Sequence, residues 1–250
     1  MNYGLYLSAT GVQTSLHRQD VHANNLANVQ TIGFKPDAVY TRERLPERIE
    51  SNDPWASPME LLEQLGGGHL ANPTRTLLTQ GSLEPTGAPL DVALDGEGFL
   101  AVQSGNGETL YTRDGRLNLN ADGELVLASN GMKVLNAQNR PIRLDPTAQL
   151  TISQDGAIQQ NGTEHDRLSI MDAVDPAAVR KQGQNLYVIE SVRLGTAQVQ
   201  QGYTETSAAN PIQALMSMTN AAKAVSANAR MMQYHDHNLE ELFGRVARVG

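Results

Sequence analysis

The chain has 250 residues, of which 19 are Lys or Arg and 27 are Asp or Glu, so its net charge at pH 7 is −8. This acidic balance argues against a nucleic-acid or anionic-lipid surface, because both need a positive footprint. The chain contains no cysteine, which excludes a disulfide framework, a thiolate zinc site and a cysteine nucleophile. No run approaches 18 apolar residues, so we expect no membrane insertion.

Residues 1–36 begin with an apolar pattern at a spacing of three and four, which indicates one face of a helix. The pattern consists of Leu5, Ala9, Val12, Leu16, Ala23 and Leu26, with Gln19 as its polar exception. An isolated helix of this length is only marginally stable, so its apolar face needs a partner. The segment also lacks the basic region and long apolar stretch of a secretory signal, so we expect no cleaved signal peptide.

The end of this helix is rich in asparagine. Asn24, Asn25 and Asn28 precede Gly33 and Phe34. One interpretation is helix termination, because asparagine and glycine both tolerate the left-handed conformation. The other is an assembly contact, because carboxamides both donate and accept hydrogen bonds and can bind the backbone of a neighbour.

The sequence between the two predicted helices has two parts of different composition. Residues 37–80 are interrupted by prolines and a triple glycine, which predicts a connector. Residues 81–206 show a period of two, which predicts a central antiparallel β domain. We expect strands at residues 90–94, 99–102, 117–119, 125–127, 150–152, 168–170 and 186–189. Four Asp-Gly pairs, at residues 95–96, 114–115, 122–123 and 155–156, are typical of tight turns.

Residues 207–250 read as a second helix. Asn210 can cap it, and Pro211 then occupies the first helical position, where its missing N–H costs nothing. The apolar positions are Leu215, Met218, Ala222, Val225, Ala229, Met232, Leu239, Phe243 and Val246, with Asp236 as the polar exception. Such sustained heptads favour a coiled-coil seam. We therefore predict an α+β fold in which the two terminal helices pair as a coiled-coil domain.

The sequence contains no convincing motif for a metal site, a phosphate loop or a catalytic site. Asp91, Asp95 and Glu97 lie near glycines, but they lack the alternating ligands and closing glutamate of a calcium loop, and turn chemistry explains the glycines. His235 and His237 are two residues apart and point to different helix faces, so they are poorly placed to bind one metal ion together. The triple glycine is not followed by Lys-Ser/Thr, and no Gly-x-Ser-x-Gly elbow occurs. We expect no enzyme, no cofactor and no metal.

Residues 23–35 resemble the N-terminal signature of the bacterial flagellar rod and hook proteins, Ala-Asn-Asn-Leu-Ala-Asn-Val-x-Thr-x-Gly-Phe-Lys. Two further blocks, residues 80–99 and 111–126, are similar to that family's Gln-Gly-x-Leu and Tyr-Thr-Arg blocks. Length and these blocks point to the FlgF/FlgG type and leave the choice between proximal and distal rod open.

The resemblance implies a structural subunit of the flagellar basal-body rod, which self-assembles through its terminal helices into an axial drive shaft that transmits torque. Its implied partners are copies of itself, other flagellar rod and hook proteins, and the flagellar type III export apparatus; its implied location is the periplasm-spanning rod. The expected subunit contacts are Leu5, Val12, Leu16, Asn24, Asn25, Leu26, Asn28, Gly33, Phe34, Leu215, Met218, Ala222, Val225, Ala229, Met232, Leu239 and Phe243. The alternative is a β-domain binding module for a cell-wall ligand, and a hydrolase ranks last.

Overall fold

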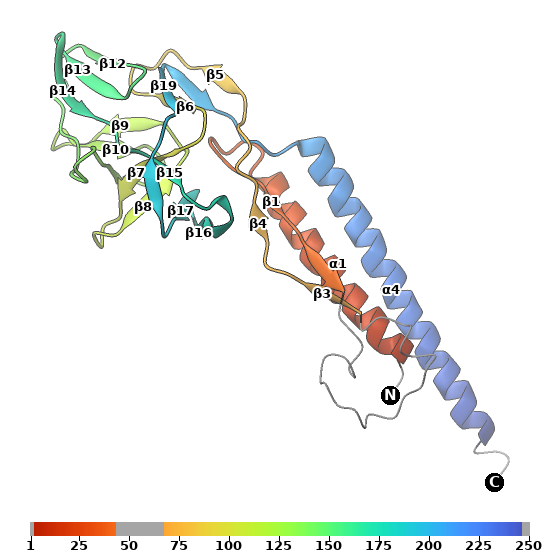
Figure 1. Cartoon of the computed structure of the whole chain (residues 1–250). Helices are drawn as coiled ribbons and strands as arrows, with labels where there is room; N and C mark the ends of the chain where they lie inside the picture. Colours follow the sequence, from red (N-terminus) through yellow and green to blue (C-terminus); the bar gives the residue numbers. More distant parts are fainter. Residues whose placement is uncertain (1–2, 44–67, 247–250) are drawn as a thin grey trace. The chain divides into compact units, whose positions relative to one another are not determined.

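The computed structural model describes residues 3–43 and 68–246. One helix lies near each end of the chain, α1 (Tyr3–Ala27) and α4 (Pro211–Val246), and most elements in the described residues between them are short strands (Figure 1). The predicted α+β class is therefore confirmed. The second helix begins at Pro211, as the Asn210-Pro211 pair predicts, because proline fits the first helical position without loss of a hydrogen bond.

The chain divides into two compact units. The helical unit consists of Met1–Leu26, Asp37–Arg75 and Pro211–Gly250, and the β unit consists of Ala27–Pro36 and Thr76–Asn210. The chain consequently passes between the units four times, at residues 26/27, 36/37, 75/76 and 210/211. This division differs from the predicted domain boundaries, 1–36, 37–80, 81–206 and 207–250. Residues 27–36 belong with the β unit, and residues 37–75 belong with the helical unit.

The predicted connector contains short strands where it is described. β2 (Thr41–Glu43) pairs antiparallel with β3 (His69–Ala71), and β1 (Asp37–Ala38) pairs with β4 (Arg75–Thr76). The Arg18 guanidinium on α1 donates a hydrogen bond to Thr41 Oγ1 at 3.0 Å, which ties β2 to the first helix. Residues 44–67 of the predicted connector lie outside the described residues.

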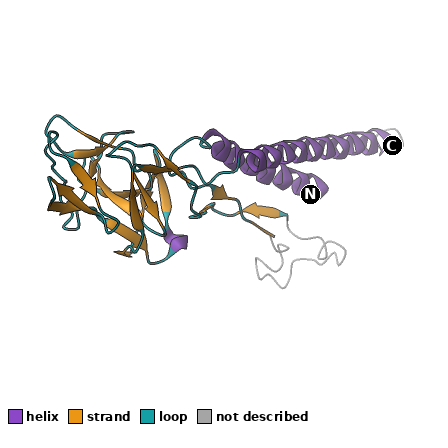
Figure 2. Ribbon diagram, turned by 90° about the horizontal axis from the view of Figure 1, so that it is seen from above, coloured by secondary structure: helices purple, strands orange, loops and turns teal. Residues whose placement is uncertain are grey.

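The β unit is built from short antiparallel strands, orange in Figure 2. Its largest sheet has the order β16-β17-β8-β7-β11-β10-β9, and β15 pairs with both β7 and β18. The smaller sheets are β12-β13-β14, β19-β6 and β20-β5. The bounds are β5 (Leu83–Pro85), β6 (Val92–Asp95), β7 (Phe99–Gln103), β8 (Thr109–Thr112), β9 (Leu117–Leu119), β10 (Leu125–Leu127), β11 (Lys133–Val134), β12 (Leu150–Ile152), β13 (Ala157–Gln160), β14 (Thr163–Arg167), β15 (Ile170–Ala173), β16 (Arg180–Gly183), β17 (Leu186–Val188), β18 (Val192–Leu194), β19 (Gln198–Gln201) and β20 (Tyr203–Glu205), with a 3₁₀ helix at Pro176–Ala178.

Most of the expected strands are found, and the exception is residues 168–170, which span the gap between β14 and β15. Three of the four Asp-Gly pairs supply the positive φ that a tight turn needs, at Gly96, Gly123 and Gly156. The fourth pair has a different cause. A Cβ atom added at Gly115 would lie 1.6 Å from the carbonyl oxygen of Val92, so this glycine is required by close backbone approach.

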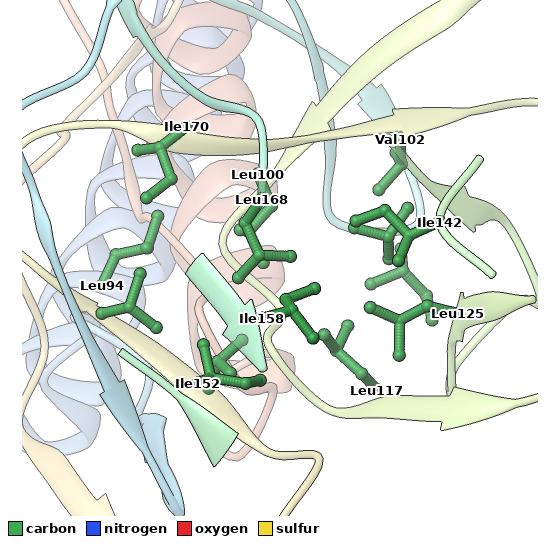
Figure 3. Packing of buried hydrophobic residues seen from close by; sticks show 14 of the residues in the cluster. Leu94, Leu100, Val102, Leu117, Leu125, Ile142, Ile152, Ile158, Leu168 and Ile170 are labelled. Atoms are coloured by element: carbon green, nitrogen blue, oxygen red, sulfur yellow. The ribbon is translucent and has the colours of Figure 1, made fainter. Parts of the chain in front are cut away.

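The larger of two apolar clusters in the described β unit gathers side chains from many of its strands. Figure 3 shows side chains of several sheets pointing toward one another, among them Leu125, Ile142 and Ile158, each with 0% of its surface exposed. A second cluster contains Phe99 and Tyr187, whose ring centroids are 5.2 Å apart. The β unit therefore has its own hydrophobic core, which is the requirement for folding as a unit.

Candidate assembly interface

The two terminal helices of the helical unit contact each other at glycines of α1. A Cβ atom added at Gly4 would lie 2.5 Å from the His235 ring, and one added at Gly11 would lie 2.9 Å from Asn228 Nδ2. The contact advances seven residues along α1, from Gly4 to Gly11, while it goes back seven residues along α4, from His235 to Asn228. The two helices therefore run antiparallel, as Figures 1 and 2 show.

Small residues continue this seam along both helices. Ser8 and Ser15 follow the glycines of α1 at the same spacing of four and three, and both are buried. Ala214 and Ala221 precede Asn228 and His235 on α4 at intervals of seven, and both alanines are buried. Small side chains let helix backbones approach closely, so the small residues of both helices contribute to this seam beside Asn228 and His235.

The predicted apolar residues of α1 lie beside the seam. At about 100° per residue, Leu5, Val12 and Leu16 are turned roughly 100–140° from Gly11, and Leu26 roughly 60°. Leu16 remains 45% exposed, and the other three are half-buried. Periodicity correctly groups these residues on one face, but the partner helix covers a neighbouring face.

The predicted residues of α4 divide into two groups. Met218, Val225 and Met232 are within roughly 40° of Ala214 and border the seam, while Leu215, Ala222 and Ala229 are turned roughly 60–100° from it. Leu215 is 50% exposed. Leu239 is half-buried, and the side chain of Phe243 lies outside the described residues.

The turned residues of both helices face the same side of the helix pair. Both helices are right-handed and they run antiparallel. Residues rotated from the seam by a positive angle on either helix therefore point to the same side of the helix pair. We call this set the flanking row; it consists of Leu5, Val12, Leu16, Leu215, Ala222 and Ala229. The β2–β3 pair lies on the opposite side, because a Cβ added at Gly68 would lie 2.7 Å from Thr10 Oγ1. A cavity of about 540 Å³ lies there, lined by Leu7, Thr14, Met231 and other residues of the helical unit.

Lengthening a seam residue is expected to separate the helices. In Gly11→Leu the added side chain collides with Asn228, and we expect a loss of about 1–3 kcal/mol in the stability of the helical unit. Thermal melting followed by far-UV circular dichroism measures this loss. Gln13→Leu, at an exposed position of the same helix, is the control; equal melting of the two variants would contradict the seam.

Three residues of the asparagine-rich motif have partners inside the chain. Asn25 donates to the carbonyl of Asp37 at 2.8 Å and accepts from its amide at 2.9 Å. The Gly33 amide donates to the Glu205 carbonyl at 2.7 Å, and Phe34 is 5% exposed. Asn25, Gly33 and Phe34 are therefore buried within the chain, and their part in subunit contacts stays a prediction. Asn24 is exposed, and Asn28 accepts a hydrogen bond from Thr31 Oγ1 at 3.0 Å.

A buried charge cluster follows the motif within the β unit, and sequence reasoning missed it. Lys35 Nζ lies 2.5 Å from Glu205 Oε1, and an Arg113 guanidinium nitrogen lies 3.1 Å from Glu205 Oε2. The side chains are 0%, 1% and 4% exposed for Lys35, Glu205 and Arg113. Burial lowers the pKa of Lys35, and the neighbouring Glu205 carboxylate opposes that shift. Two cations thus share one buried carboxylate.

Arg113 is held by further acceptors. Its guanidinium donates to the carbonyl oxygens of Leu94 at 3.1 Å and Gly96 at 2.6 Å. A Cβ added at Gly33 would lie 2.4 Å from the backbone of Arg113, so Gly33, with its φ of +66°, cannot be replaced without displacement of this segment.

The residues considered for chemistry remain scattered. Within residues 3–43 and 68–246, no group of three or more His, Asp or Glu side chains is placed to hold a metal ion. His237 lies 3.7 Å from Glu241 on the next turn of α4, which is an ordinary helix pair. None of the helices in the described part of the chain is long and apolar enough to span a membrane.

Three family models match successive parts of the chain. The family described as flagella basal body rod protein matches residues 5–35, the flagellar hook protein FlgE/F/G D1 domain matches residues 93–160, and the flagellar basal body rod FlgEFG protein C-terminal family matches residues 200–244. The first and last include most of α1 and α4, and the second lies in the β unit.

Relatives match over nearly the whole length. The flagellar basal-body rod protein FlgF of Caulobacter vibrioides is 30% identical over 255 residues, which cover 100% of this chain and 99% of the relative. The rod protein FlgG of Buchnera aphidicola from Acyrthosiphon pisum is 30% identical over 257 residues, covering 95% and 97%. The flagellar hook-basal body complex protein FlhO of Bacillus subtilis is 26% identical over 271 residues, covering 98% and 99%.

The three matching families are all families of flagellar rod and hook proteins, which places the chain in the class of flagellar structural proteins. The chain belongs to the flagellar basal-body rod protein family, and its function is that of a structural rod subunit of the flagellar basal body. The cell-wall binding module is not favoured, because the relatives are rod proteins.

Proposed function

We propose that this rod subunit self-assembles through its terminal helices, with the flanking row as the contact to neighbouring subunits. The observation that carries this proposal is that the small-residue seam occupies the contact between α1 and α4, while Leu16 and Leu215 of the flanking row stay 45% and 50% exposed among the described residues. Burial of apolar surface contributes about 25 cal/mol per Å², so a row along both helices is a strong source of association free energy.

Within each subunit, α1 and α4 act as a two-helix coiled coil. The heptad interval on α4, from Ala214 to His235, and the spacing of four and three on α1 support this arrangement. Asn24, Asn28, Leu26, Met218, Val225, Met232, Leu239 and Phe243 remain proposed secondary contacts. Packed helices of successive subunits then transmit torque along the rod.

The proposed partners are copies of this chain and other flagellar rod and hook proteins, as the names of the relatives suggest. We further propose that the flagellar type III export apparatus delivers the subunit to the periplasm-spanning rod without cleavage of a signal peptide. The alternative route, a cleaved leader, predicts a shortened N-terminus in the assembled rod.

Replacing one residue of the flanking row tests this interface. We expect Leu16→Asp to reduce the copies of the chain in purified hook-basal bodies at least about tenfold, because the carboxylate must lose its hydration in an apolar contact. Mass spectrometry of particles from the native host measures the copies, and its N-terminal peptide reports whether a leader was removed.

Gln13→Asp is the matched control, since Gln13 is exposed on α1 and lies outside the flanking row. Both variants should keep the β-type circular dichroism of the β unit. Incorporation of Leu16→Asp at the level of the control would exclude the flanking row as a subunit contact.

A further inference from the structure

Three segments of the β unit lead to the helical unit, and all three meet at one carboxylate, that of Glu205. The segment 27–36 reaches it through Lys35, at 2.5 Å. The segment 76–82 reaches it through the Gly81 amide, which donates to Glu205 Oε1 at 2.8 Å, and through the Thr79 carbonyl, which accepts from Lys35 Nζ at 2.8 Å. The segment 203–210 carries Glu205 itself. These segments adjoin all four passages of the chain between the units.

Backbone hydrogen bonds between the same segments surround the carboxylate. The Gly33 amide donates to the Glu205 carbonyl at 2.7 Å, the Thr206 amide to the Ser82 carbonyl at 2.8 Å, and the Ala208 amide to the Phe34 carbonyl at 3.0 Å. These bonds form only when the three segments are in register. We call the amides of Gly33, Gly81, Thr206 and Ala208 the junction amides.

We propose that Glu205 is a positioning residue that fixes the register of these three segments, and with it the points at which the chain leaves the β unit. Without its carboxylate, Lys35 and Arg113 lose the buried anion that both of them contact, and the segments that carry them separate. The inference goes beyond the rod function and does not depend on assembly, because the contacts lie within one chain.

A second carboxylate of the β unit provides a matched control. Glu124 is 4% exposed, lies 2.8 Å from Lys133 Nζ and 3.2 Å from an Arg143 guanidinium nitrogen, and so also joins two cations. The hydrogen bond from Lys133, followed by that from Asn120, lowers its pKa to about 2. Glu124 is distant in sequence from the three segments, and the nearby backbone bonds provide control amides, those of Leu125 and Leu144.

Native-state hydrogen exchange of the full chain tests the assignment. In Glu205→Gln we expect the junction amides to exchange at least about tenfold faster than in the parent, while the control amides keep their rates. In Glu124→Gln the pattern should reverse. Equal acceleration of all β-unit amides in Glu205→Gln, or unchanged junction amides, would overturn the proposal, since a merely stabilising ion pair predicts one of these two results.

A milder variant decides the matter if Glu205→Gln does not fold. Glu205→Asp keeps the charge but is one methylene shorter, so it cannot reach Lys35 and Arg113 together. We expect selective acceleration of the junction amides here too. Uniform acceleration, or none, would again contradict a positioning role.

Discussion

Gly115→Ala is expected to destabilise the β unit by at least about 3 kcal/mol. The new Cβ would lie 1.6 Å from the Val92 carbonyl oxygen and 2.8 Å from its carbon, both of which are backbone atoms. Neither can move freely, because the Val92 amide donates to the Gly115 carbonyl at 2.9 Å and the Val92 side chain is 1% exposed. Urea titration followed by circular dichroism measures the loss.

Gly105→Ala is the control for this experiment. Nothing lies within 4 Å of a Cβ atom added there, so we expect a change within about 0.5 kcal/mol. If Gly115→Ala unfolds at the same urea concentration as Gly105→Ala, the close approach to Val92 does not exist in solution.

Leu125→Ala is expected to cost about 2–5 kcal/mol, because Leu125 is completely buried and its removal leaves a cavity in the main core. The same urea titration measures this change. Leu194→Ala removes the same atoms from a side chain that is 76% exposed, and should change stability by at most about 0.5 kcal/mol. Similar losses in both variants would be inconsistent with the observed core.

Local sequence signals predicted the elements well. Pro211 marks the start of the second helix because its fixed φ suits the first helical turn, where its missing N–H costs nothing. The short apolar run Leu125, Val126 and Leu127, followed by turn residues, predicts a strand, and β10 occupies those residues. Such signals depend only on nearby residues in the sequence, so they can be used without knowing which elements pack together.

Local signals failed where a partner decides the outcome. The apolar spacing of Val12 and Leu16 reports a face that needs cover, but it does not say which element covers it. Backbone approach favours Gly4 and Gly11 for the contact with α4, and glycine carries no hydropathy signal. The contact between the helices therefore lies at the glycines of α1, beside the predicted apolar face.

Glu205 shows a second limit of sequence reasoning. Its charged partners are Lys35, 170 residues earlier, and Arg113, 92 residues earlier, and no spacing rule connects them. Lys35 and Arg113 do belong to the blocks that resemble the rod and hook family, whereas their shared carboxylate lies at the end of β20, outside these blocks. Only the fold brings the three together.

The seam has a consequence for the order in which the molecule folds. Gly11 and Asn228 are more than 200 residues apart, whereas most strands of the β unit pair with strands close by in the chain. Closing so long a loop is entropically unfavourable until the β unit has formed and shortened the chain that separates the helices. We therefore expect helix pairing to follow the folding of the β unit, so that α1 pairs only after the much later segment of α4 has been synthesised.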